Sequence, residues 1–155
     1  MAIRSWELTM NPFDPKTVVL AKHAQHVVLI HFPIGLFIAG AAFDAVAHRT
    51  KKASFAAAAR YNLIAAAISV VPVLISGLLA WYFALGAPKF TGVLLLHLVL
   101  ACVTSILMGV VGWVHYRAIQ QAEAPDYRLP IELVAVFLLA LTAHLGGFLS
   151  GVNAG

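Results

Sequence analysis

Long runs of apolar residues alternate with short polar stretches along most of the chain. A helix needs roughly 20 apolar residues to cross the hydrocarbon core of a bilayer, and four of the runs reach that length. The sequence predicts membrane spans at about residues 27–47, 63–85, 92–114 and 131–152. Pro33 and Pro72 fall inside the first two spans, where a membrane bundle tolerates proline with a local kink. The pattern predicts an all-α integral membrane protein, a four-helix transmembrane bundle with short loops.

Composition supports the same fold class. Of 155 residues, 62% are hydrophobic and only 10% are charged, whereas soluble domains carry about 25% charged residues. The four spans use most of the length and leave no room for a soluble domain. We therefore expect an N-terminal surface segment at residues 1–26 and one transmembrane bundle at residues 27–155.

The basic residues indicate an orientation in the membrane. The connections after the first and third spans carry six of them, Arg49, Lys51, Lys52, Arg60, Arg117 and Arg128, against Arg4, Lys16, Lys22 and Lys89 on the other side. Cytoplasmic connections are enriched in lysine and arginine. We expect a bacterial inner membrane protein with both termini in the periplasm. Topology thus explains the net charge of +4, and we expect no nucleic-acid partner.

Three histidines, His31, His97 and His144, lie within the predicted spans. Threaded at 1.5 Å per residue, all three fall roughly 7–12 Å below the outer surface. His26 lies just above them at the start of the first span. An ionisable side chain inside a span is costly to bury and is by default a functional-site hypothesis, so four histidines near one depth predict a site.

Haem is the favoured ligand of this layer. Two histidines on facing helices can bind both faces of a b-type haem iron, and small and aromatic residues beside the layer would line a flat slot: Phe32, Gly35, Gly146, Gly147 and Phe148. His31 and His97 are the preferred axial ligands because their depths are most similar. His144 and His26 are the alternative pair, as ligands or as hydrogen-bond partners of the haem propionates.

Other interpretations remain open. His48 and His115 end the first and third spans and would hold a second haem about 26 Å away along the axis, or else lie at the membrane interface. A bare metal ion, a proton relay, or histidines that only bond neighbouring helices are alternatives to haem. Asp44 could bond a neighbouring helix, reach the membrane interface or carry protons, and a structural role is favoured. Glu132 with Arg128 is expected to form an interfacial pair.

Several segments resemble one family. Residues 23–44, HAQHVVLIHFPIGLFIAGAAFD, contain a histidine upstream of His-Phe-Pro; VPVLISGLLAWYF (71–83), His97 within LLLHLVLA, and HLGGFLSGVN (144–153) follow in order. Together they resemble the domain-of-unknown-function 2231 family of four-span prokaryotic membrane proteins. In that family the upstream histidine is usually followed by proline, whereas here Val27 follows His26.

The resemblance implies electron transfer near the outer face, because relatives are fused to Rieske iron–sulphur or c-type cytochrome domains. This sequence has no CxxCH motif and a single cysteine, Cys102, so such a centre would belong to a separate subunit. We expect a cytochrome b-like electron-transfer subunit that exchanges electrons with quinone or a periplasmic redox partner, within an oligomer or larger complex. We expect an electron-transfer protein or subunit in preference to a stand-alone enzyme.

Two other functions are the alternatives. One is a non-redox structural or assembly subunit of a membrane complex, and the other is a metal-binding membrane protein. A transporter is less favoured because the sequence shows no evident internal repeat.

Overall fold

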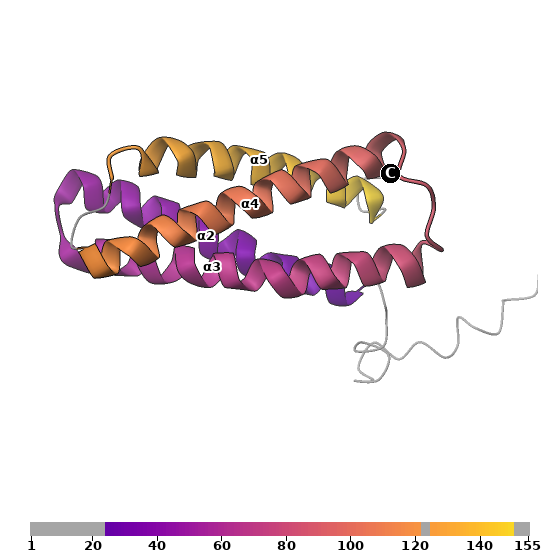
Figure 1. Cartoon of the computed structure of the whole chain (residues 1–155), viewed down its shortest axis with the longest axis horizontal. Helices are drawn as coiled ribbons and strands as arrows, with labels where there is room; N and C mark the ends of the chain where they lie inside the picture. Colours follow the sequence, from indigo (N-terminus) through magenta and orange to yellow (C-terminus); the bar gives the residue numbers. More distant parts are fainter. Residues whose placement is uncertain (1–23, 122–124, 151–155) are drawn as a thin grey trace, which may run out of the picture.

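The described part of the chain folds into four long helices. The computed structural model describes residues 24–121 and 125–150: α2 (Ala24–Thr50), α3 (Ala53–Leu79), α4 (Gly92–Gln121) and α5 (Arg128–Leu149), with a single π-helical turn, η1 (Ala80–Ala84), continuing α3 (Figure 1). Each long helix is apolar and long enough to span a membrane, which confirms the four-span prediction. The predicted N-terminal surface segment lies outside the described residues, except for residues 24–26, which begin α2.

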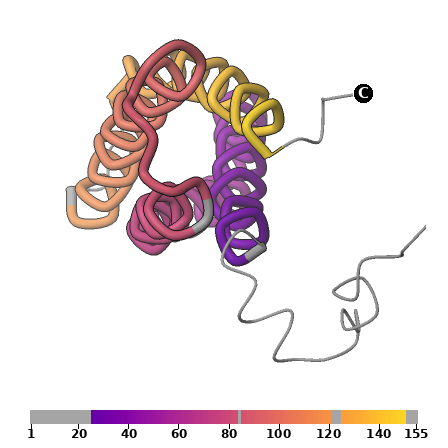
Figure 2. The backbone as a smooth tube through the Cα atoms, turned by 90° about the vertical axis from the view of Figure 1, so that its right-hand side faces the viewer, coloured from indigo at the N-terminus to yellow at the C-terminus, as the bar shows by residue number. Residues whose placement is uncertain are grey.

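The helices form a ring in which each contacts two neighbours, in the order α2, α3, α4, α5 and back to α2 (Figure 2). The α2–α3 contact is the most extensive and the α5–α2 contact the smallest. Helices α2 and α4 therefore occupy opposite corners. The bundle has two ends: the His97 end, where α2 and α4 begin, and the His115 end, where they finish (Figure 1).

The helices extend beyond the predicted spans at the His115 end. The second helix begins at Ala53 instead of near residue 63, and the third continues to Gln121. The segment from Ala53 to Tyr61 is rich in alanine, which has the highest helix propensity, although it is less hydrophobic than the rest of the span. Neither Pro33 nor Pro72 interrupts its helix.

The buried positions repeat between the two helical hairpins, α2–α3 and α4–α5. The same number of residues separates Phe37 from Met108 and Asp44 from His115 along the chain. The same number also separates the partly buried His26 from His97. A second constant spacing relates three positions of α3 to three of α5: Leu63 to Glu132, Ala66 to Ala135, and Val70 to Leu139. The two hairpins thus bury equivalent helix faces. This repeat of buried positions is not evident from the amino-acid sequence. A bundle with such a repeat is as compatible with a transporter as with the other functions.

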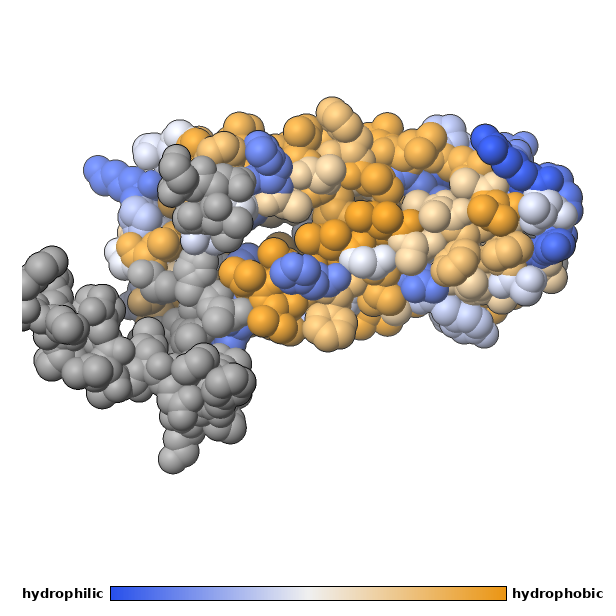
Figure 3. Space-filling model, turned by 180° about the vertical axis from the view of Figure 1, so that it is seen from behind, coloured by the Kyte–Doolittle hydropathy of each residue, from blue (hydrophilic) through white to orange (hydrophobic). Residues whose placement is uncertain are grey.

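Packing is uneven along the bundle. The buried core lies in its middle and towards the His115 end. At the His97 end, no described residue of α4 before Thr104 and none of α5 after Leu139 is buried. Figure 3 shows an opening between the helices near this end, at the left of that view. The outer surface of the bundle is mostly apolar (Figure 3), as lipid contact requires.

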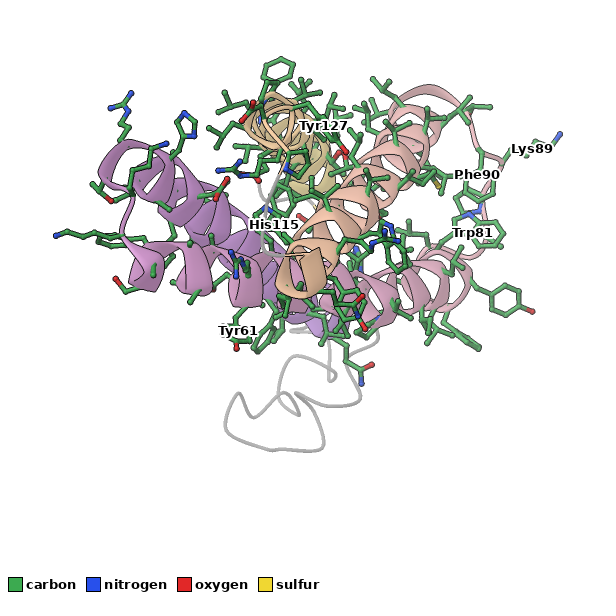
Figure 4. All side chains as sticks on the ribbon, turned by 60° about the vertical axis from the view of Figure 1, so that its left-hand side comes forward. Tyr61, Trp81, Lys89, Phe90, His115 and Tyr127 are labelled. Carbon is green, nitrogen blue, oxygen red and sulfur yellow. The ribbon has the colours of Figure 1, made fainter. Side chains whose placement is uncertain are left out.

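Aromatic side chains pack against one another in the connection between η1 and α4, at the His97 end. The rings of Trp81 and Phe90 stack with centroids 4.7 Å apart, and the Trp81 indole N–H donates to the carbonyl oxygen of Pro88 at 3.0 Å (Figure 4). Gly86 supports this tight turn with a positive φ of 73°, which glycine adopts without steric cost. Trp81 and the exposed Tyr82 lie at a helix end, where amphipathic aromatic rings are typical of the membrane interface.

Candidate functional site

His97 lies on the inward face of α4 and contacts α5. Seven residues separate it from the buried Thr104, two helical turns further along the same face. Its Nδ1 donates to the carbonyl oxygen of Thr142 at 3.1 Å. Its Cε1 also lies so close to Gly146 that a Cβ built there would be 3.2 Å away. The ring therefore packs on a glycine of α5, and the bond to Thr142 leaves Nε2 as the nitrogen with the lone pair.

His26 has the same arrangement on the other hairpin. It lies seven residues before the buried Pro33, and its Nδ1 is 3.0 Å from Oγ of Ser76 on α3. The Ser76 hydroxyl already donates to the carbonyl oxygen of Val73 at 2.9 Å, so Oγ accepts from His26. The ring packs on Gly77, where a Cβ would lie 3.0 Å from Cε1. In His26, as in His97, the lone pair therefore belongs to Nε2.

His31 and His144 are exposed. On α2, His31 lies on the side opposite the buried positions Pro33 and Phe37, and its Nδ1 donates to the carbonyl oxygen of Val27 in its own helix at 2.6 Å. The ring of His144 meets the edge of Phe148, with centroids 5.0 Å apart. The predicted layer thus separates into two histidines that face neighbouring helices and two on the outside.

The donor set at the His97 end is suited to a metal or a haem iron. Histidines that bind metals almost always donate their other ring N–H to a carbonyl, a carboxylate or another acceptor, which fixes the ring and its tautomer. His26 and His97 both meet this requirement, from opposite corners of the ring of helices. Each ring packs on a glycine of the neighbouring helix, and an opening lies between the helices near this end (Figure 3). His31 also donates from Nδ1, as His26 and His97 do, but it is exposed and does not face a neighbouring helix.

A second polar cluster, formed by Asp44, His115, Glu132 and Arg128, lies at the His115 end. Nε2 of His115 is 2.7 Å from Oε1 of Glu132, and Nε of Arg128 is 2.7 Å from Oδ2 of Asp44. Asp44, His115 and Glu132 are each at most 3% exposed. Figure 4 shows His115 on the inner side of α4, between the surrounding helices. We call this group the His115 cluster.

The His115 cluster contains two buried polar atoms whose hydrogen bonds are not made. Nδ1 of His115 and Oε2 of Glu132 have no hydrogen-bond partner within the described part of the chain. Buried polar atoms are paired in the great majority of cases. The cluster is therefore short of hydrogen bonds.

The sequence-based interpretation did not bring these residues together. Arg128 pairs with Asp44 of α2 instead of with Glu132, and His115 is a buried partner of Glu132 instead of an interfacial residue. His48, its predicted companion in a second haem site, is exposed in the last turn of α2 and is not part of the cluster. The sequence does contain a clue to the cluster. Asp44 and His115 occupy equivalent positions in the two hairpins, so both are expected to face the interior of the bundle.

Comparison with known proteins agrees with the fold. The model of the family described as predicted membrane protein, DUF2231, matches residues 22–153. No curated protein and no solved structure matches the chain. The four helices with their buried histidine-bearing faces therefore belong to a member of the DUF2231 family of predicted membrane proteins.

Proposed function

We propose that this protein is a cytochrome b-like membrane subunit that binds one haem b at the His97 end and transfers electrons there. His26 and His97 are the axial ligands that the side-chain arrangement favours; the His31–His97 pairing preferred from depth alone stays a prediction. The observation that carries the proposal is the matched setting of the two rings. Each donates from Nδ1 to a neighbouring helix and rests on a glycine of that helix.

The uneven packing supports the same proposal. A four-helix bundle normally fills its interior to high density, yet among the described residues none of α4 before Thr104 and none of α5 after Leu139 is more than partly buried. A haem between α2 and α4 would cover this apolar interior. When bound, haem iron supplies reversible one-electron transfer, and the protein tunes its potential through ligands, hydrogen bonds and burial. The chain's part is to hold the two rings and exclude water.

Quinone in the bilayer and a periplasmic redox subunit are the proposed electron partners. In the orientation expected from the basic connections, the His97 end faces the periplasm. A bacterial inner membrane location and periplasmic termini belong to the same proposal.

A non-redox structural or assembly subunit is the second candidate. It is favoured by one observation: the bond from His97 to Thr142 satisfies a partly buried histidine across a helix contact without any cofactor. In this case the histidines serve only to orient the helices.

The absorption spectrum of the purified protein separates the two candidates. Protein expressed with an adequate haem supply is expected to be red, with a Soret band that sharpens and shifts on reduction with dithionite. A colourless preparation of folded protein contradicts the haem proposal and leaves the structural candidate.

Two glycine variants test the proposed slot. Gly146→Ala places a Cβ 3.2 Å from Cε1 of His97 and pushes the ring. Gly35, which the sequence suggested as part of the slot, is exposed, and Gly35→Ala meets nothing within 4 Å. We expect Gly146→Ala to lower the haem content or shift the Soret band, and Gly35→Ala to match the wild type. Equal spectra for both variants would show that the ring of His97 is not a ligand.

A further inference from the structure

We propose that the His115 cluster is a binding site for one divalent transition-metal ion, ligated by Asp44, His115 and Glu132. The site lies at the opposite end of the bundle from the proposed haem and does not depend on it. Its ligands come from three helices, α2, α4 and α5, so that a bound ion would also join them.

The geometry is close to that of a coordination sphere. One ligand atom from each of the three residues lies within 4.8 Å of the other two. Nitrogen and oxygen ligands bind Zn²⁺ at about 2.0–2.2 Å, so two ligands of one ion are roughly 3–4 Å apart. Small side-chain movements would therefore bring the three atoms to coordinating distance. The side chains are already held in place by burial.

The unpaired atoms provide a second, independent observation. Nδ1 of His115 and Oε2 of Glu132 are buried without a hydrogen-bond partner in the described structure, although both side chains are at most 2% exposed. A metal ion gives these two residues the electrophilic partner that the protein does not supply. Bound through Nδ1 of His115 and Oε2 of Glu132, the ion would leave the 2.7 Å bond between Nε2 and Oε1 in place.

Charge favours a cation at the same place. The cluster holds two carboxyl groups and one guanidinium, so a cation would supply the second positive charge that two carboxylates require inside a membrane helix bundle, where uncompensated charge is costly. Arg128 bonds Asp44 at 2.7 Å and would orient this ligand from outside the coordination sphere. One imidazole with two carboxylates suits Zn²⁺, Mn²⁺, Fe²⁺ or Co²⁺, and not the soft Cu⁺ ion.

Metal titration of the purified full chain tests the site. The affinity tag is removed, the protein is stripped with a chelator in detergent, and Zn²⁺ or Co²⁺ is added while binding is followed by calorimetry or by the visible absorption of Co²⁺. We expect one equivalent to bind, with an affinity that falls as the pH falls. Glu132→Gln and Asp44→Asn are expected to weaken binding by about tenfold or more. The matched control, His48→Ala, removes an exposed histidine of the same end and should bind as the wild type does.

Wild-type protein alone also gives a result if the variants do not fold. Zn²⁺ should raise its melting temperature, because a ligand that binds only the folded state stabilises it, and should displace Co²⁺ in competition. No stoichiometric binding, binding unchanged in a folded Glu132→Gln variant, or binding lost in His48→Ala would each overturn the site. A protein that responds to pH but to neither metal would show a proton site instead. Haem content, read from the Soret band of Glu132→Gln, should stay unchanged, which separates this test from that of the proposed function.

Discussion

The buried pair of His115 and Glu132 allows a quantitative test of how the helices are held together. Replacing Glu132 by leucine, the residue found at the equivalent position 63 of the other hairpin, removes the acceptor of the 2.7 Å bond to Nε2. His115 is 2% exposed and Nδ1 already has no hydrogen-bond partner in the described structure, so neither ring nitrogen would retain a bond within this pair.

The expected cost follows from this burial. A buried polar group left unsatisfied costs about 1–3 kcal/mol, and removing one partner of a buried ion pair costs about 3–5 kcal/mol. We expect Glu132→Leu to lower the free energy of unfolding by about 3 kcal/mol, and His115→Leu by a similar amount. The double variant should cost less than the two together, because neither side chain then leaves an unpaired partner; a coupling of about 2 kcal/mol is expected.

The assay is a double-mutant cycle in detergent with a chelator present, so that metal binding does not contribute. Unfolding is induced by sodium dodecyl sulphate and followed by tryptophan fluorescence and circular dichroism. His48→Leu, at an exposed histidine of the same end, should stay within about 0.5 kcal/mol of the wild type. Additive single effects, or a loss no larger than that of His48→Leu, would refute the reasoning that this pair joins α4 to α5.

Two further predictions concern packing and orientation. In Gly112→Ala the new Cβ would lie 2.5 Å from Cβ of Ala67 on α3, so thermal unfolding should show a free energy of unfolding lower by about 1–3 kcal/mol. The control Gly109→Ala, which meets nothing within 4 Å, should be neutral or slightly stabilising. Equal losses in the two variants would contradict the α3–α4 contact. The orientation is tested with single cysteines introduced into a variant that lacks Cys102. Lys89→Cys should react with an impermeant thiol reagent in intact cells, and Lys52→Cys should react only after lysis. The reverse pattern would show the opposite orientation in the membrane.

The spans could be predicted because a bilayer imposes a length and an apolar composition on any helix that crosses it. The start of α3 could not, because the alanine-rich segment from Ala53 onward is helical by propensity and by packing while its hydropathy is lower. Alanines here let helices approach closely: Ala59 and Ala66 are fully buried on α3. A hydropathy argument does not detect this contribution.

Counting residues predicts the depth of the candidate site, but it does not predict which side of each helix the histidines occupy. Counting residues placed His31 and His97 at one level, yet depth does not specify which side of a helix a residue occupies. The spacing of His26 and His97 from Pro33 and Thr104 contained that information, because residues seven apart share a helix face. The His115 cluster was harder to predict, since it requires knowing which faces of α2, α4 and α5 meet.

The most direct test of the proposed function compares two histidine variants of one helix. His26→Ala and His31→Ala change residues five positions apart on α2, one facing α3 and one exposed. If His26 and His97 hold a haem, the Soret band of the purified protein should be lost or strongly shifted in His26→Ala and preserved in His31→Ala. A Soret band that survives His26→Ala but disappears in His31→Ala would contradict this account.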